Sequence, residues 1–371
     1  MLEVEIHQIG IMGGGTNAAL LCLEAKKKGI KTTIVDNDMY CPAAHIADEH
    51  LVAPLDKNAL LKLIQRTKAI VFTAKLEDPK DYSPLLKEKI PVYPEFEVLD
   101  SLSSRQRFLW KMEQQEIPII PYTRLDNEIE LLELLKDIEL PVSITKYYKS
   151  QSQDNSSNEI VVLSDEDLVD LLVEKDKQID YWLVEKIHLE SVELSVGVTR
   201  DIKGKIYTYS VAEDIYDSGS WIQSHIPARI TKTLQNKAMA LAKKAIRTLR
   251  GAGTYTVRIS IDQGKELYVR DIYPYAVENT VYTNESCSIS QHDHLLRTIL
   301  GIPLFPSVFH GVVFLHLENS TITGGIDNMS QVLVKPGTNI YGFPGKLPSD
   351  ATFLYTFKAD TWEGLEENIK V

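Results

Sequence analysis

The first hundred residues alternate between short apolar runs rich in β-branched residues and longer amphipathic stretches. Strands are expected at the apolar runs, residues 4–12, 31–35, 69–73 and 91–93, and helices at residues 16–28 and 60–66. Strands and helices that alternate in this way form parallel sheets with crossover helices. The pattern therefore predicts a doubly wound α/β layer. A helix expected at residues 101–115 leads out of this layer into the rest of the chain.

The rest of the chain follows a different pattern, with long alternating runs typical of antiparallel strands. Helices are expected at residues 127–138 and 231–250, and strands at residues 140–145, 181–186, 192–199, 205–212, 254–261 and 266–273. The polar run at residues 149–158 predicts a mobile loop. From about residue 305 the sequence is β-rich with Gly and Pro turns. At about 150 residues per domain, a chain of 371 residues predicts two or three domains.

The charge balance excludes some classes of protein. Lys and Arg number 40 against 52 Asp and Glu, which gives a net charge of −12 and argues against sequence-independent nucleic-acid binding. No apolar run reaches the roughly 18 residues that span a bilayer, so we expect no membrane segment. No secretory signal is visible, and three distant cysteines indicate neither a disulfide framework nor a zinc site. The expected location is the cytoplasm.

A glycine-rich turn joins the first strand to the first helix. It contains Gly13, Gly14 and Gly15 and fits G-x-G-x-x-A, with Asp36 at the end of the second strand, about 20 residues on as a ribose-binding acid would be. Amides at a helix start can bind an anion, so the loop is consistent with a dinucleotide-binding enzyme. An ordinary strand-to-helix turn in a parallel sheet explains the glycines equally well.

The segment after this loop favours a more specific interpretation. Residues 36–48 read DNDMYCPAAHIAD, which resembles the signature D-x-D-x-x-C-P-A-x-x-x-A-D of the 5-(carboxyamino)imidazole ribonucleotide synthase family. Collinear matches follow at residues 92–94 (VYP), 117–122 (IPIIPY), 183–185 (LVE), 193–195 (ELS), 226–228 (IPA), 285–291 (ESCSISQ), 295–297 (LLR) and 301–304 (GIPL). The resemblance thus extends over nearly the whole chain.

The resemblance implies an ATP-grasp fold of three parts: a Rossmann-like domain at residues 1–100, a two-lobed ATP-grasp domain at residues 101–300 and a small β-rich domain at residues 301–371. It implies ATP-dependent carboxylation of aminoimidazole ribonucleotide in purine synthesis, ATP as cofactor and a homodimer. By the same resemblance, the candidate nucleotide-binding residues are Arg105, Lys146, Glu185, Ile187 and Glu193. The candidate substrate residues are Gly13, Gly14, Gly15 and Glu77.

Several positions depart from the family pattern where the chemistry is expected. Arg258 stands where the family has a metal-binding glutamate, and Arg270 replaces an amide beside Asp271, the one carboxylate left for magnesium. Two guanidiniums beside one carboxylate disfavour a divalent cation, and an ion pair of Asp271 with Arg258 or Arg270 is the favoured interpretation. Thr145 replaces the phosphate-loop lysine; Lys146, one residue on, should point to the opposite face of its strand.

Other cationic positions of the family are also changed. The glycine lid that covers the phosphates is absent from residues 147–155, Leu109 replaces a lysine, and residues 341–353 retain one lysine of the substrate phosphate site. These changes predict weak or absent synthase activity. The alternatives are a nucleotide-sensing or scaffold protein and an ATP-grasp ligase redirected to another substrate, in which Arg258 and Arg270 could hold a carboxylate. Cys41 and Cys287 are expected to pack in the interior, and His292 and His294 to lie on the surface.

Overall fold

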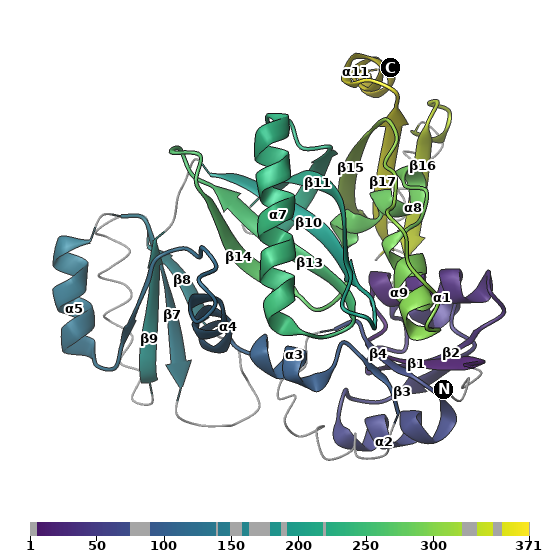
Figure 1. Ribbon diagram of the computed structural model, residues 1–371, viewed down its shortest axis with the longest axis horizontal. Coiled ribbons are helices and arrows are strands. Elements are labelled where there is room, and N and C mark those ends of the chain that lie inside the picture. The colour runs from purple at the N-terminus through teal and green to yellow at the C-terminus, as the bar shows by residue number, and fades with distance from the viewer. Residues whose placement is uncertain are drawn as a thin grey trace.

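The computed structural model describes residues 6–74, 90–138, 140–148, 158–162, 179–186, 191–217, 220–320, 332–343 and 351–370. Figure 1 shows the N-terminal layer at one end, a large sheet crossed by one long helix in the middle, and a smaller sheet at the other end. Within these ranges, no helix is both long and apolar enough to span a membrane. The predicted mobile loop at residues 149–158 lies outside the described residues except for its last position.

The N-terminal layer is a five-stranded parallel sheet, as the alternating pattern predicts. Its strands lie in the order β3 (Glu49–Val52), β2 (Lys31–Asp36), β1 (Gln8–Met12), β4 (Ile70–Phe72) and β5 (Val92–Tyr93). Helices α1 (Thr16–Lys26) and α2 (Lys57–Arg66) connect them, and α2 begins where the Asp56 side chain accepts a hydrogen bond from Ala59 N (2.8 Å). That bond satisfies one of the free amides of the first turn. The sequence pattern missed β3, which has partly exposed residues on both faces.

A four-stranded antiparallel sheet forms the far end of the molecule (Figure 1). Its strands lie in the order β6 (Tyr122–Leu125), β9 (Ile179–Lys186), β7 (Val142–Tyr148) and β8 (Asn158–Val162). Helix α5 (Glu128–Asp137) covers one face of it, where Leu131 packs against Val142, Ile144 and Val184. This face therefore has its own small core, and the opposite face is free to border a cavity.

The central sheet has eight strands in the order β14 (Leu267–Tyr273), β13 (Gly253–Ile261), β10 (Val192–Arg200), β11 (Ile206–Asp217), β12 (Ser220–Ile226), β15 (Val312–Ser320), β17 (Ala351–Ala359) and β16 (Thr338–Phe343). The strands predicted at residues 254–261 and 266–273 are confirmed as β13 and β14, which pair with each other across the turn at Gln263 and Gly264. Because β12 pairs with β15, the β-rich C-terminal part continues this sheet. The boundary near residue 300 stays a prediction.

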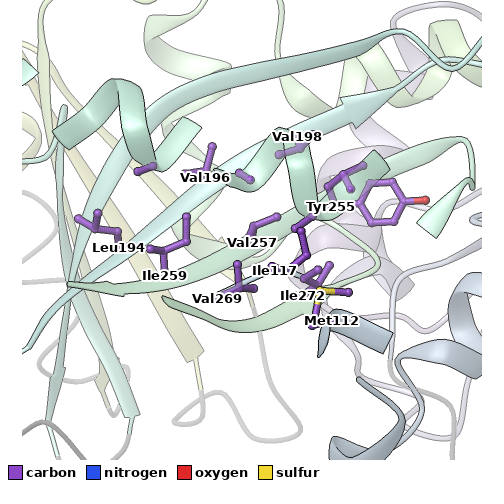
Figure 2. Packing of buried hydrophobic residues seen from close by; sticks show 14 of the residues in the cluster. Met112, Ile117, Leu194, Val196, Val198, Tyr255, Val257, Ile259, Val269 and Ile272 are labelled. Carbon is purple, nitrogen blue, oxygen red and sulfur yellow. The ribbon is translucent and has the colours of Figure 1, made fainter. Parts of the chain in front are cut away.

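Helix α7 (Lys232–Leu249) packs across β10, β11 and β14 and closes the main core (Figure 1). Figure 2 shows Val196, Val257 and Ile259 of the sheet pointing toward the same interior as Met112 and Ile117. Met112 belongs to α4 (Arg105–Glu113), which follows α3 (Phe96–Ser101). The single helix predicted at residues 101–115 is thus wrong in its start, because Ser104 caps a new helix there by accepting a hydrogen bond from Arg107 N (3.4 Å).

Helices α8 (Tyr282–Ser286) and α9 (Gln291–Ile299) lie between the N-terminal layer and the central sheet, and α11 (Trp362–Lys370) ends the described chain. The surface location predicted for His292 and His294 is wrong, since both are buried. Helix α9 is covered by α1 on one side and by β10 and β13 on the other. Burial lowers the pKa of both imidazoles to about 4, and His294 Nδ1 lies 2.5 Å from the Tyr209 hydroxyl.

Candidate functional site

A cavity of about 280 Å³ lies between the four-stranded sheet and the β13–β14 edge of the central sheet. We call it the inter-sheet cavity. Its walls come from α4 and the turn before it, from β7 and β9, and from β13 and β14: Leu102, Ser104, Arg105, Phe108, Ile120, Ser143, Thr145, Tyr147, Glu185, Lys186, Arg258, Arg270 and Asp271. The lining carries four cationic side chains and two carboxylates. The lining therefore has a net positive charge on a protein whose net charge is −12.

Arg105 and Glu185 form an ion pair in this cavity. Arg105 Nε donates to Glu185 Oε2 at 2.9 Å, Nη2 lies 2.5 Å from Oε1, and Nη1 donates to the carbonyl of Arg270. Burial alone would lower the pKa of Arg105, but the Glu185 carboxylate raises it. Two residues predicted to bind the nucleotide therefore come together, and the pair ties α4 to both sheets.

Glu193 lies at the start of β10 and binds both of the unexpected arginines. Its Oε1 is 3.0 Å from Arg270 Nη1, and its Oε2 is 3.8 Å from Arg258 Nη2. Ser260 Oγ also donates to Oε1 at 2.6 Å. The Glu193 carboxylate is thus neutralised by two guanidiniums. We call Glu193, Arg258 and Arg270 the Glu193 cluster.

The ion pair predicted between Asp271 and Arg258 or Arg270 is wrong. Asp271 stands opposite Arg258 in the β13–β14 register, but Arg270 sits in a bulge and, like Arg258, turns to Glu193. Asp271 Oδ1 accepts the backbone N–H of Ile272 at 2.8 Å. Nowhere in the described ranges do three or more His, Cys, Asp or Glu side chains form a group that could hold a metal. One carboxylate beside two guanidiniums does not fit a divalent cation, because the local charge is repulsive.

The two faces of β7 differ as its alternation predicts. Ser143, Thr145 and Tyr147 line the inter-sheet cavity, whereas Lys146 is 2% exposed and is not part of the lining. Lys146 therefore lies on the face opposite the site that the resemblance assigned to it. Of the remaining predicted site residues, Ile187 and Glu77 lie outside the described residues.

A second cavity, of about 390 Å³, lies between the glycine loop and the central sheet, and we call it the aromatic cavity. Gly15, Thr16, Asn17 and Thr73 line it from the N-terminal layer. The central sheet and the segment after β14 supply Tyr216, Trp221, Arg258, Tyr273, Tyr275, Val277, Glu278 and Asn279. The four aromatic residues of this lining, Tyr216, Trp221, Tyr273 and Tyr275, were not identified from the sequence. The pattern that could have indicated them is the two-residue spacing of Tyr273 and Tyr275, which places both on one face of an extended segment.

The glycine loop is held from behind by the DNDMYC segment. Asp36 Oδ2 accepts the N–H of Gly14 (2.7 Å), and Asp36 Oδ1 accepts that of Asp38 (2.9 Å). Cys41 is buried against Gly14, as the sequence predicts for a packing cysteine. Both carboxylate oxygens of Asp36 accept hydrogen bonds from the loop, so Asp36 is poorly placed to bind a ribose. The segment at residues 36–48 instead stabilises the glycine turn.

This packing predicts a clear difference between two neighbouring glycines. A Cβ on Gly14 would overlap Cys41 Sγ and lie 3.0 Å from Asp36 Cβ, whereas a Cβ on Gly15 meets nothing within 4 Å. We expect Gly14→Ala to lower the free energy of unfolding by about 2–3 kcal/mol, the usual cost of overpacking. Gly15→Ala should cost at most about 1 kcal/mol, for the weaker helix cap. Denaturant unfolding of both variants checks this, and equal losses would contradict it.

Arg258 is the side chain that the linings of both cavities share. Its guanidinium lies over the Tyr216 ring, 4.5 Å from the centroid. Burial alone would lower its pKa, but the nearby Tyr216 and Tyr273 side chains and Glu193 raise it. It is therefore a permanent cation in the wall between the two cavities.

Comparison with known proteins agrees with this architecture. Residues 110–292 match the ATP-grasp domain, and residues 6–102 match the ribonucleotide synthetase preATP-grasp domain. The N5-carboxyaminoimidazole ribonucleotide synthase of Bacillus subtilis is 28% identical over 302 residues, 80% of this chain and 77% of the relative. The phosphoribosylaminoimidazole carboxylase of Candida glabrata is 25% identical over 311 residues, 81% of this chain and 53% of that protein.

Solved structures show the same fold. An ADP complex of an N5-carboxyaminoimidazole ribonucleotide synthetase superposes with a TM-score of 0.87 at 23% identity, covering 100% of this chain and 97% of that one. The Aspergillus clavatus enzyme in complex with ADP and 5-aminoimidazole ribonucleotide gives a TM-score of 0.85 at 18% identity, covering 98% and 96%.

The fold and the two domain matches define an ATP-grasp protein with a preATP-grasp domain in front of it. Proteins named as N5-carboxyaminoimidazole ribonucleotide synthases are similar to this chain over most of its length. The resemblance drawn from the signature at residues 36–48 is thereby confirmed.

Proposed function

We propose that this protein binds an adenine nucleotide in the inter-sheet cavity and that its synthase activity is weak or lost. The observation that carries the proposal is the Glu193 cluster, in which Arg258 and Arg270 take the place of metal-binding groups and neutralise Glu193. Relatives of the same fold are described as ADP complexes, which supports the nucleotide. The homodimer, the cytoplasmic location and domain boundaries near residues 100 and 300 belong to the same proposal.

In this proposal, each lining residue has a role in binding. Arg105, fixed by Glu185, and Arg258 and Arg270 offer guanidinium N–H groups to phosphate oxygens, which are strong charge-assisted hydrogen bonds. Ser143, Thr145 and Tyr147 supply neutral polar atoms along β7. A metal-dependent transfer step has no support from this donor set, because Glu185 and Glu193 are paired with the arginines and Asp271 stands beside them.

Two assays test the proposal. ATP- and bicarbonate-dependent carboxylation of aminoimidazole ribonucleotide should be at least about a thousandfold slower than with an intact synthase, since one lost transition-state donor alone costs about 10²–10³. Calorimetric titration with ATP and ADP should show binding with and without magnesium. Turnover at a normal rate would refute the loss of activity, and no nucleotide binding would leave a scaffold role.

The orientation of β7 predicts how a cation can be added to the site. We expect Thr145→Lys to tighten ATP binding about tenfold, because the side chain points into the cavity and one charge-assisted hydrogen bond contributes about 1.5 kcal/mol or more. Lys146→Met should change ATP affinity less than twofold, since Lys146 is outside the lining. Titration of both variants measures the effect; a large loss with Lys146→Met would show that Lys146 reaches the nucleotide.

A further inference from the structure

Apart from Arg258, the residues that line the aromatic cavity take no part in the proposed nucleotide site. Its volume of about 390 Å³ falls in the range of about 300–1,000 Å³ typical of small-molecule sites. The Tyr216, Trp221, Tyr273 and Tyr275 side chains supply flat apolar walls. Trp221 is fixed by a hydrogen bond from Nε1 to Ser224 Oγ at 2.8 Å. These walls would accept a planar or aliphatic body a few ångströms thick.

Three residues of the cavity lining carry a buried polar atom that has no partner among the described residues. The atoms are Arg258 Nε, Asn17 Oδ1 and Asn279 Oδ1, and both asparagines are more than nine-tenths buried. The orientation of Asn279 is fixed, because its Nδ2 donates to Ser195 Oγ and to Asp214 Oδ2, both at 2.9 Å. Its Oδ1 is therefore a true acceptor with no donor. The wall of the cavity is therefore held in place by the central sheet on this side.

The charges on the wall restrict the kind of ligand. Among the described lining residues Arg258 is the cation and Glu278 the carboxylate, so the cavity presents one charge of each sign. Glu193 does not occupy all the N–H donors of Arg258. Its contact with Arg258 is 3.8 Å long, and its nearer partner is Arg270 at 3.0 Å. A ribonucleotide phosphate, which carries two negative charges, would meet one shared guanidinium and an opposing carboxylate. A ligand with one acidic and one basic group is better matched.

We propose that the aromatic cavity binds a free amino acid, with its carboxylate on Arg258 and its ammonium group on Glu278. The guanidinium suits a carboxylate because it offers paired N–H donors. The ammonium group would also gain from the faces of the surrounding aromatic rings. The inference rests on one part of the proposed function, the loss of synthase activity, because the cavity would otherwise hold aminoimidazole ribonucleotide. It does not depend on ATP binding in the inter-sheet cavity.

The test is a binding screen on the intact protein without nucleotide. The probes are the twenty standard amino acids, followed by matched sets such as phenylalanine, phenethylamine and 3-phenylpropanoate, or histidine, histamine and imidazole propionate. At least one amino acid should raise the melting temperature and bind by calorimetry. Its analogues without the carboxylate or without the amine should each bind at least about tenfold more weakly, the effect of one charge-assisted hydrogen bond.

Variants with a matched control locate the site. Arg258→Met and Glu278→Gln should each weaken amino-acid binding at least about tenfold. Arg229→Met removes a half-exposed guanidinium that lines neither cavity, so it should leave that binding unchanged. If Arg258→Met does not fold, the analogue series on the wild-type protein still decides the matter.

The outcomes are distinct from those of the nucleotide assays. Binding of no amino acid, or equal binding of the amine-free and carboxylate-free analogues, would overturn the inference. So would micromolar binding of aminoimidazole ribonucleotide that displaces the amino acid and depends on Arg258. Amino-acid binding without any ATP binding would retain this inference while removing the proposed nucleotide site.

Discussion

Replacing Glu193 by alanine is expected to lower the free energy of unfolding by about 3–5 kcal/mol, because removal of one partner leaves buried charges uncompensated. Glu193 is the carboxylate that Arg258 and Arg270 both contact, and its side chain is 14% exposed while that of Arg258 is 22% exposed. Ser260 Oγ would also lose its acceptor. Urea unfolding followed by circular dichroism measures the loss.

A thermodynamic cycle separates the charge effect from simple truncation. Adding Arg258→Met and Arg270→Met to Glu193→Ala should recover at least half of the lost stability, since a buried ion cluster replaced by apolar side chains is often no less stable. Asp126→Ala, which breaks an exposed pair with Arg124 (2.9 Å), is the control and should cost less than about 1 kcal/mol. If Glu193→Ala leaves the free energy of unfolding unchanged, water already solvates both guanidiniums.

The partner of these arginines shows what the sequence could not supply. The β13–β14 hairpin is local, so its pairing of Arg258 with Asp271 could be predicted from the residues between them. Glu193 comes from β10, on the other side of β13, where Ser260 lies opposite it. That contact depends on a long-range register and on the bulge at Arg270, and neither leaves a pattern in the sequence.

Local patterns succeeded where one element decided the outcome. The glycine loop, the parallel N-terminal layer and the two faces of β7 follow from turn chemistry and from the alternation of strands. The prediction that His292 and His294 of α9 lie on the surface was wrong for the opposite reason. A polar residue on a helix suggests solvent, but α9 is enclosed by α1 and by the central sheet, so His294 is satisfied by Tyr209 and by the carbonyl of Phe305 (3.1 Å). Tertiary packing overrides the surface interpretation there.

The aromatic cavity required both kinds of information. Its glycine loop was visible in the sequence, yet the facing wall joins the β11–β12 hairpin to the end of β14, about 50 residues later. The aromatic residues are spread over this distance and match no motif. A cavity formed by segments so far apart can be found only once the sheet order is known.

Leu109→Lys is expected to destabilise the protein by more than about 4 kcal/mol, the sum of a lost core leucine and a buried amine without a carboxylate partner. The family resemblance implies a lysine at this position, but Leu109 is 0% exposed and packs in the main core with Met112 and Val257. Trp110→Lys, at a site 60% exposed, is the control and should cost less than about 1 kcal/mol.

Denaturation midpoints decide this prediction together with ATP titration of any folded variant. A stable Leu109→Lys protein that binds ATP more tightly would show that the amine passes Phe108 and reaches the inter-sheet cavity. The expected loss of stability would instead show that the core has been repacked around leucine. In that case a single reversion could not restore the family's cation at this position, because the surrounding apolar side chains now require leucine's shape and lack of charge.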